Sequence, residues 1–377
     1  MNATSRSRHR LTTTLLATAG LLCVPVTAAA QSAGSATAKE RKWTIEAFGG
    51  YAFSPSVPSG AASVQFPAGN QFPTEGGFTS RSNPSWYFGD GAVLFNEVAA
   101  QFGSQFNIQV PRIVPLDTML GEAGRQDQSG SSFGGRITRK LTSRLSLELG
   151  FQRSQAKTGL TDGASAALEA SRASFEAGFQ ELLSTIPQAG LQVRSTLERL
   201  TSETTTSRMV VSAVLNVAVV RSGPLGIHVS GGVGRSTSSS GPLSVRLRGE
   251  YGFRFFDVNP ISETDNVTLR MTDDASAIVG VFGGGFTYDV GARHGLRADV
   301  RVYVGDNAQT TVVEAVPFVS RTGPALTLPS ATNPSIQFSN TTLLPSSLSG
   351  TLTDFTTFTS AGREVRPHLT VGYFLRF

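Results

Sequence analysis

The sequence predicts an all-β protein: an eight-stranded antiparallel up-and-down transmembrane β-barrel whose long external loops contain short helices. Three observations support this prediction. Apolar side chains recur at every second residue over eight segments, as in strands with one apolar and one polar face. Short and long connections alternate strictly between these segments. After an N-terminal apolar stretch, no run of eighteen apolar residues follows, so the sequence contains no candidate membrane helix.

The last nine residues form the clearest predicted strand. They end on an aromatic side chain, which is unusual for a terminus that frays in water. The arrangement is understandable if the apolar face lies in lipid. That face carries Leu369, Val371, Tyr373, Leu375 and Phe377.

The N-terminal segment has the features of an export signal. Arginines precede an apolar run at 11–26, and three alanines at 28–30 form a cleavage site, which predicts a signal peptide over residues 1–30. Cys23, the only cysteine, lies within it, so we expect no disulfide in the mature chain. Removing residues 1–30 lowers the net charge from +5 to +2, which gives no indication of a nucleic-acid partner. Residues 31–42 are polar and predict a periplasmic lead-in.

The alternating segments define the predicted strands of the membrane part, residues 43–377. The first strand covers 43–53, and three hairpins of one design follow before the terminal strand. The hairpins are 133–141 with 144–151, 208–219 with 227–233, and 278–290 with 296–304.

The connections between these strands fall into two classes. Short turns lie near residues 142, 222 and 293, whereas the long loops cover about 54–130, 155–205, 238–276 and 306–364. This alternation is typical of an up-and-down barrel with short periplasmic turns and long external loops. A soluble eight-stranded barrel would share the period of two, but it would not require long loops at one rim, an export signal and an aromatic terminus together.

The long loops contain predicted secondary structure of their own. A short helix opens at Asp90, with a further turn at 116–122. Asp162 is a candidate cap for a second helix that ends at Pro187. Its apolar face carries Leu168, Phe175, Phe179, Leu182 and Ile186. Two alternating stretches at 243–255 and 267–271 predict a hairpin that continues the fifth and sixth strands beyond the membrane. If this hairpin spans the membrane instead, the barrel has ten strands.

The polar faces of the predicted strands supply the candidate functional residues. An eight-stranded barrel is just wide enough for its own side chains, so charges inside it must pair with one another or with trapped water. We therefore expect a charge network that closes the lumen, and the alternative is a narrow or gated pore lined by the same charges. The predicted lumen network comprises Glu46, Arg136, Lys140, Glu148, Arg208, Asp289, Arg297, Asp299, Arg301 and Arg376, beside His228 and His368.

The sequence gives little support for catalysis. His294 falls in a predicted turn, and His228 and His368 are expected near the periplasmic ends of strands, away from an outer-rim active site. The Cys, His and Asp residues do not show metal-ligand spacing, and the glycine pairs do not precede a helix with Lys-Ser/Thr. We expect no enzyme activity, no metal and no cofactor.

The terminal strand, the predicted signal peptide and the alternation of turns and loops resemble the outer-membrane β-barrel class, in particular its OmpA-like small barrels. Three loop phrases, at 85–91, 169–175 and 334–340, also resemble outer-membrane barrel proteins of environmental Gram-negative bacteria. The resemblance implies the fold and a location in the outer membrane of a Gram-negative bacterium, but it implies no activity. It also implies that the terminal strand is the assembly signal recognised by the barrel-insertion machinery.

We therefore expect a monomeric barrel with a structural or surface-interaction role. Its expected partners are outer-membrane lipid, the insertion machinery and an extracellular partner bound through the loops, and nucleic acid is not expected. The alternative is a porin-like channel for small polar solutes, and an outer-rim hydrolase is a third hypothesis.

Overall fold

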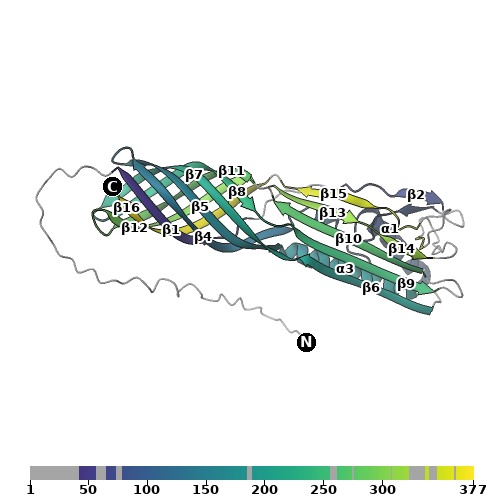
Figure 1. The fold of residues 1–377 in the computed structure, drawn as a ribbon. Helices are drawn as coiled ribbons and strands as arrows, with labels where there is room; N and C mark the ends of the chain where they lie inside the picture. The colour runs from purple at the N-terminus through teal and green to yellow at the C-terminus, as the bar shows by residue number, and fades with distance from the viewer. Residues whose placement is uncertain are drawn as a thin grey trace, which may run out of the picture. The chain divides into compact units, whose positions relative to one another are not determined.

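A computed structural model describes residues 42–56, 65–73, 79–184, 189–254, 261–273, 276–306, 308–321, 336–338, 346–360 and 362–377. Eight of its strands form a closed barrel (Figure 1). They are β1 (Trp43–Ala52), β4 (Arg125–Lys140), β5 (Leu145–Leu160), β7 (Glu203–Ser222), β8 (Leu225–Ser239), β11 (Ser276–Asp289), β12 (His294–Asp306) and β16 (Arg363–Arg376).

The ring confirms the predicted strand number and topology. Each barrel strand pairs antiparallel with the barrel strands before and after it in the chain, and β1 closes the ring against β16. The ten-strand alternative is wrong, because the predicted extra hairpin forms β9 (Leu243–Arg254) and β10 (Ile261–Asp273) in a second sheet. The prediction that this hairpin continues the fifth and sixth barrel strands is also wrong, because β9 and β10 belong to the second sheet. The described helices include none that is long and apolar enough to cross a membrane.

The outer face of the barrel is apolar along the middle of its strands. Val211 on β7, Val300 on β12 and Val371 on β16 are each 55–59% exposed. On the terminal strand, the five predicted outward residues at 369, 371, 373, 375 and 377 are all exposed. We call this band of exposed apolar side chains around the barrel the apolar belt. It would be unfavourable in water, since monomeric soluble proteins rarely expose large contiguous apolar patches.

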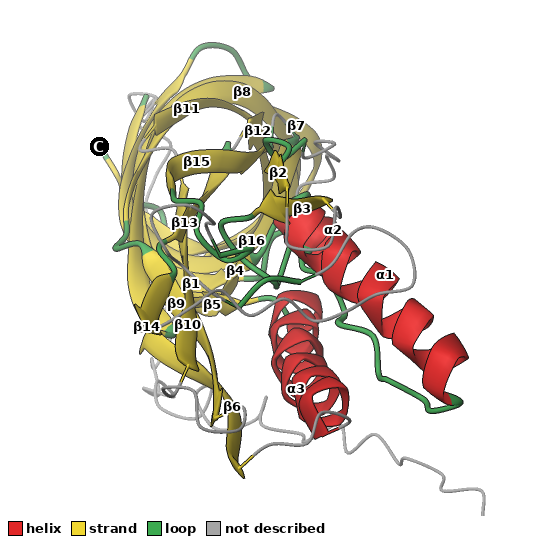
Figure 2. Ribbon diagram, turned by 90° about the vertical axis from the view of Figure 1, so that its right-hand side faces the viewer, coloured by secondary structure: helices red, strands yellow, loops and turns green. Residues whose placement is uncertain are grey.

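The long connections fold into a second structure, which we call the loop assembly. It contains a six-stranded sheet in the order β15-β13-β10-β9-β6, with β14 paired to β10, and a small β2-β3 sheet (Figures 1 and 2). Beside β9 and β10, its strands are β2 (Asn70–Pro73), β3 (Thr79–Ser82), β6 (Ala189–Thr201), β13 (Gln309–Ala315), β14 (Phe318–Arg321) and β15 (Leu352–Thr359). Its helices are α1 (Gly89–Phe106), α2 (Asp117–Leu120) and α3 (Asp162–Ser184).

The barrel strands are longer than the sequence pattern predicts. β4 begins at Arg125 instead of residue 133, and β5 continues to Leu160 instead of ending at 151. In these extensions the outward side chains are polar, as with the exposed Gln155 and Lys157. The alternation of apolar and polar residues therefore ends before the strand does.

The predicted helices are present, with one correction. In α1, Leu94, Val98 and Phe102 are all buried on one face, as expected. In α3 the first turn is capped by Thr161, not Asp162, because the Ala164 backbone N–H donates to Thr161 Oγ1 at 3.1 Å. The predicted end of this helix, at Ile186 and Pro187, lies outside the described residues, as do the predicted signal peptide and residues 31–41.

An aromatic core holds the loop assembly together. Phe179 on α3 stacks on Tyr251 of β9 with ring centroids 4.4 Å apart, and it also packs on Phe95 of α1 at 4.6 Å. Tyr87 stacks on Phe175 at 4.9 Å. These side chains come from three of the four long connections, so the loops form one packed structure and are not independent.

Asp265 lies at the edge of this core with an incomplete set of hydrogen bonds. Its Oδ2 accepts from the Ser85 hydroxyl at 2.9 Å and from the Trp86 backbone N–H at 2.6 Å. Oδ1 has no hydrogen-bond partner among the described residues. Burial raises the pKa of Asp265 to about 7, although both hydrogen bonds to Oδ2 favour the charged form.

This pKa predicts that the loop assembly loses stability as the pH rises. In the unfolded chain Asp265 titrates near pH ~4, so between about pH 4 and 7 the folded state binds the extra proton and stability falls with rising pH. Urea unfolding followed by the fluorescence of the buried Trp86 should give a higher midpoint at pH 5.5 than at pH 8. Asp265→Asn should reduce this difference, and an unchanged difference in that variant would contradict the assignment.

Candidate functional site in the barrel interior

Inward-facing charges from four barrel strands meet in one cluster, which we call the inner layer. It consists of Glu46 (β1), Arg136 (β4), Glu148 (β5) and the β12 residues Arg297, Asp299 and Arg301, with His228 of β8 beside them. All are buried. Because side chains alternate across a strand, the β12 residues at 297, 299 and 301 project inward together. The three guanidinium groups and three carboxylates balance in charge.

Glu148 accepts hydrogen bonds from two arginines and an amide of the barrel interior. Arg301 binds it through two hydrogen bonds, Nη1 to Oε1 at 2.6 Å and Nη2 to Oε2 at 3.0 Å. Arg297 Nη1 and the Asn216 amide also donate to Oε2, at 3.0 and 3.1 Å. Bidentate charge-assisted pairs of this kind are among the strongest hydrogen bonds in proteins.

Asp299 and Arg136 extend the cluster across the lumen. Arg136 Nη1 contacts Asp299 and reaches Glu46 Oε1 at 3.2 Å, and its guanidinium lies 4.1 Å from the centre of the Phe48 ring. Asp299 Oδ2 lies 3.0 Å from Arg297 Nε. The Nε2 atom of His228 lies 2.9 Å from Asp299 Oδ1. The ion pairs of the inner layer therefore form one continuous network that joins β1, β4, β5 and β12.

Two glycines provide the space for this cluster. A Cβ atom at Gly285 would overlap the Asp299 carboxylate, and one at Gly372 would overlap the Glu46 carboxylate. This agrees with the general role of strand glycines at sites of close approach.

A second charged cluster, the mouth layer, lies at the other end of the strands. It comprises Asp127, Arg208, Glu364 and Arg366. Arg366 Nη2 binds Asp127 Oδ2 at 2.6 Å and also contacts Glu364. The contacts of Arg208 are longer, at 3.5 Å to Glu364 and 3.8 Å to Asp127. Next to this layer, Arg125 of β4 binds Asp273 of β10 at 2.8 Å and so connects the barrel to the loop assembly.

Sequence reasoning missed most of the mouth layer. Glu364 and Arg366 continue the inward alternation of His368, but the predicted strand begins at 369. Asp127 is out of phase with Arg136 because a β-bulge between Asp127 and Gly130 shifts the register. Extending the period of two backward from His368 would have predicted Glu364 and Arg366 as inward residues. No sequence pattern indicated the bulge near Asp127.

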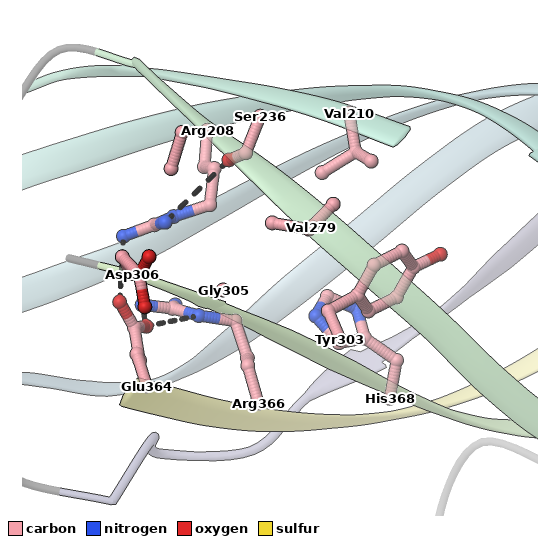
Figure 3. A pocket seen from close by; sticks show the side chains of 11 residues that line it. Arg208, Val210, Ser236, Val279, Tyr303, Gly305, Asp306, Glu364, Arg366 and His368 are labelled. Atoms are coloured by element: carbon pink, nitrogen blue, oxygen red, sulfur yellow. Dashed lines mark hydrogen bonds and ion pairs between the residues drawn. The ribbon is translucent and has the colours of Figure 1, made fainter. Parts of the chain in front are cut away.

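A small cavity lies next to the mouth layer (Figure 3). Its volume of about 20 Å³ is enough for one or two water molecules. Arg208, Tyr303, Glu364, Arg366 and His368 are among its lining residues. The Gln152 amide donates to His368 Nδ1 at 2.7 Å and accepts from the Tyr303 hydroxyl at 2.6 Å.

The remaining predicted lumen residues lie apart from the inner layer. Arg208 belongs to the mouth layer. Asp289 and Arg376 pair with each other at 2.6 Å near the short turns, and Lys140 ends β4 at the same rim. His368 lies in the middle of β16, beside the cavity, and not near a periplasmic strand end as predicted. His228 is close to the short turn that begins β8, as expected.

The geometry allows charge neutralisation and lumen closure without an added ion. Among the described residues, no group of three or more His, Cys, Asp or Glu side chains could hold a metal. Separating the paired charges of the inner layer would leave buried charges without a partner, which is costly.

Comparisons with known proteins give weak similarities. No protein-family model matches the chain, and no curated protein matches it. Among solved structures, CarO of Acinetobacter baumannii is similar over 67% of this chain and 97% of its own, at 12% identity and a TM-score of 0.25. An outer membrane channel from Pseudomonas putida F1 covers 90% of this chain and 97% of its own, at 11% identity and a TM-score of 0.23. The similarity to the Pseudomonas putida toluene transporter TodX covers 90% of this chain and 91% of the TodX chain, at 9% identity and a TM-score of 0.17.

The inner layer predicts a strong dependence of barrel stability on Glu148. Glu148→Gln would leave three buried guanidinium groups facing two carboxylates, and breaking a buried ion pair in this way costs about 3–5 kcal/mol. Urea unfolding of the refolded barrel, followed by heat-modifiable gel mobility, should show this loss. The matched control is Glu203→Gln on the barrel exterior, where the exposed pair with Lys157 at 3.6 Å is worth at most ~1 kcal/mol. Equal effects of the two substitutions would contradict the prediction.

Proposed function

We propose that this chain is an outer-membrane β-barrel protein of the small-barrel type, in which a closed barrel anchors the loop assembly for a structural or surface-interaction role. The barrel then crosses the outer membrane of a Gram-negative bacterium, with the short turns in the periplasm and the loop assembly outside.

The membrane placement is supported by the outer face of the barrel. Its apolar side chains are exposed on all eight strands, and burial in lipid removes this surface from water. Aromatic residues border the belt: Trp43 and Phe377 lie near the short turns, and Tyr51 and Phe53 lie at the other end of β1. Aromatic girdles at both interfaces are typical of outer-membrane barrels.

The closed, charge-balanced inner layer is the observation that carries the functional proposal. A barrel that conducts solutes needs a hydrated path, but here Glu148 of β5 binds Arg297 and Arg301 of β12, and Asp299 of β12 binds Arg136 of β4. The barrel is therefore suited to anchoring, and the part of the chain able to recognise a partner is the loop assembly. Loops on a rigid scaffold commonly carry function.

The proposal predicts that the refolded mature protein gives no steady openings in a planar bilayer. Its folding should first be verified by heat-modifiable gel mobility, because an unfolded sample would also be silent. Steady openings whose conductance shifts with Arg297→Gln or Arg301→Gln would contradict the proposal.

A gated channel for small polar solutes is the second candidate function, and the mouth cavity favours it. Arg208 contacts its partners at 3.5 Å or more, and its Nε has no hydrogen-bond partner among the described residues. This end of the lumen is less tightly paired than the inner layer, so it is the part most able to rearrange. The bilayer measurement separates the two candidates.

A loop replacement tests the role of the loop assembly. Gly159 of β5 pairs with Glu203 of β7, so a two- to four-residue turn of the length common in hairpins can replace residues 161–201. This removes Phe175 and Phe179 from the aromatic core but leaves all eight barrel strands. We expect the variant to keep its heat-modifiable mobility and to lose its ability to restore envelope integrity in a strain that lacks the gene. Full restoration by this variant would contradict a role for the loop assembly.

A further inference from the structure

The short-turn rim of the barrel carries a concentration of positive charge. Arg144 and Arg293 lie in two of the three short turns, and Arg221 lies at the end of β7 beside the third turn; all three are exposed. The ends of the neighbouring strands and the residue before β1 add Lys42, Arg139, Lys140 and Arg376. Over these turns and strand ends, all of which the structure describes, Asp289 is the only acidic residue.

Asp289 neutralises only part of this charge. It pairs with Arg376 at 2.6 Å and with Arg221 at 3.4 Å. Lys42, Arg139, Arg144 and Arg293 form no ion pair with an acidic side chain among the described residues. This contrasts with the barrel interior, where each arginine of the inner layer faces carboxylates. The exposed rim charges are therefore available to an external anion.

The position of these charges indicates which anion they would meet. Arg139 lies beside Trp43 in the β1–β4 pairing, with its guanidinium carbon 5.4 Å from the centre of the indole ring. Trp43 is also hydrogen-bonded through its backbone to Phe377, which ends the apolar outer face of β16. Exposed aromatic rings at the edge of an apolar belt mark the depth of lipid headgroups. The basic side chains are thus next to headgroups and are not remote from the membrane.

We propose that this basic rim binds the phosphate groups of anionic phospholipids in the leaflet that borders the short turns. The proposal rests on the membrane placement proposed above. A soluble polyanion would also be attracted by the charge, but the adjacency of Arg139, Trp43 and the apolar belt favours a lipid. Basic residues near an anionic membrane surface each contribute favourably to the attraction, and binding should weaken at high salt.

Trp43 provides a local probe for the test. The mature protein is reconstituted into dioleoylphosphatidylcholine vesicles that contain about one fifth brominated phosphatidylglycerol or, in a parallel sample, brominated phosphatidylcholine. Bromine quenches the fluorescence of a tryptophan only at contact distance, so the fluorescence of the buried Trp86 in the loop assembly should not change. We expect stronger quenching by the anionic lipid, corresponding to a relative binding constant of roughly tenfold over phosphatidylcholine, and we expect this preference to disappear in 1 M salt.

Two matched variants identify the groups responsible. In a triple variant with Lys42→Gln, Arg139→Gln and Arg144→Gln, both lipids should quench the Trp43 fluorescence equally. The variant with Arg139→Lys and Arg144→Lys keeps the charge and should retain the preference for the anionic lipid. Equal quenching in the unmodified protein, or a preference that persists in the triple glutamine variant, would overturn the basic-rim proposal. Absence of quenching by both brominated lipids would instead contradict the membrane placement itself, so the two failures are distinguishable.

Discussion

The ion pairing between Glu148 and the arginines at 297 and 301 is the interaction on which the barrel depends. Eight strands enclose a narrow space, in which the charged side chains of the inner layer are buried. A buried charge needs an opposite charge at hydrogen-bond distance. The β12 sequence Arg-Ala-Asp-Val-Arg satisfies this requirement within one strand, because its three charged residues project inward and alternate in sign. Glu46 of β1, Glu148 of β5 and Arg136 of β4 complete the charge balance, and Gly285 and Gly372 leave room for the cluster.

The same principle extends to the junction between the barrel and the loop assembly. The mouth layer also has equal numbers of arginines and carboxylates, and Arg125 pairs with Asp273 across the junction. The connection is further supported by Gln309, whose side-chain amide donates to the Arg125 carbonyl at 3.1 Å. Arg125 of the barrel strand β4 therefore bonds to residues of the loop assembly through both its side chain and its backbone carbonyl.

Much of this architecture could be predicted from the sequence, for physical reasons that can be located. The eight barrel strands were evident because the ring has an apolar outer face and a polar inner face, which imposes a strict alternation, as in Leu145–Leu149 and Leu296–Val304. The inner-layer residues followed from the same alternation. Beyond the apolar belt the outward side chains become polar, so the apolar signal ended before the strands did, and the Asp127 bulge left no signal in the sequence. In the second sheet, the alternation at 243–255 and 267–271 predicted strands but not the strands with which they pair. The pairing of β6 with β9, and of β10 with β13, depends on contacts between separate loops that no local pattern encodes. Thr161 was missed as a cap because Asp162, equally suitable by type, stands next to it.

Closure of the lumen by paired charges can be measured through the accessibility of a single inward-facing thiol. Ser212 of β7 is buried and pairs with Gly150, beside the inner layer, and the mature chain is predicted to lack cysteine. Ser212→Cys should therefore be the only thiol and should resist a charged methanethiosulfonate reagent for hours, while Ser262→Cys on the exposed part of β10 reacts within minutes. Comparable reaction rates at the two positions in the folded protein would show that the lumen is open to water and would contradict the account.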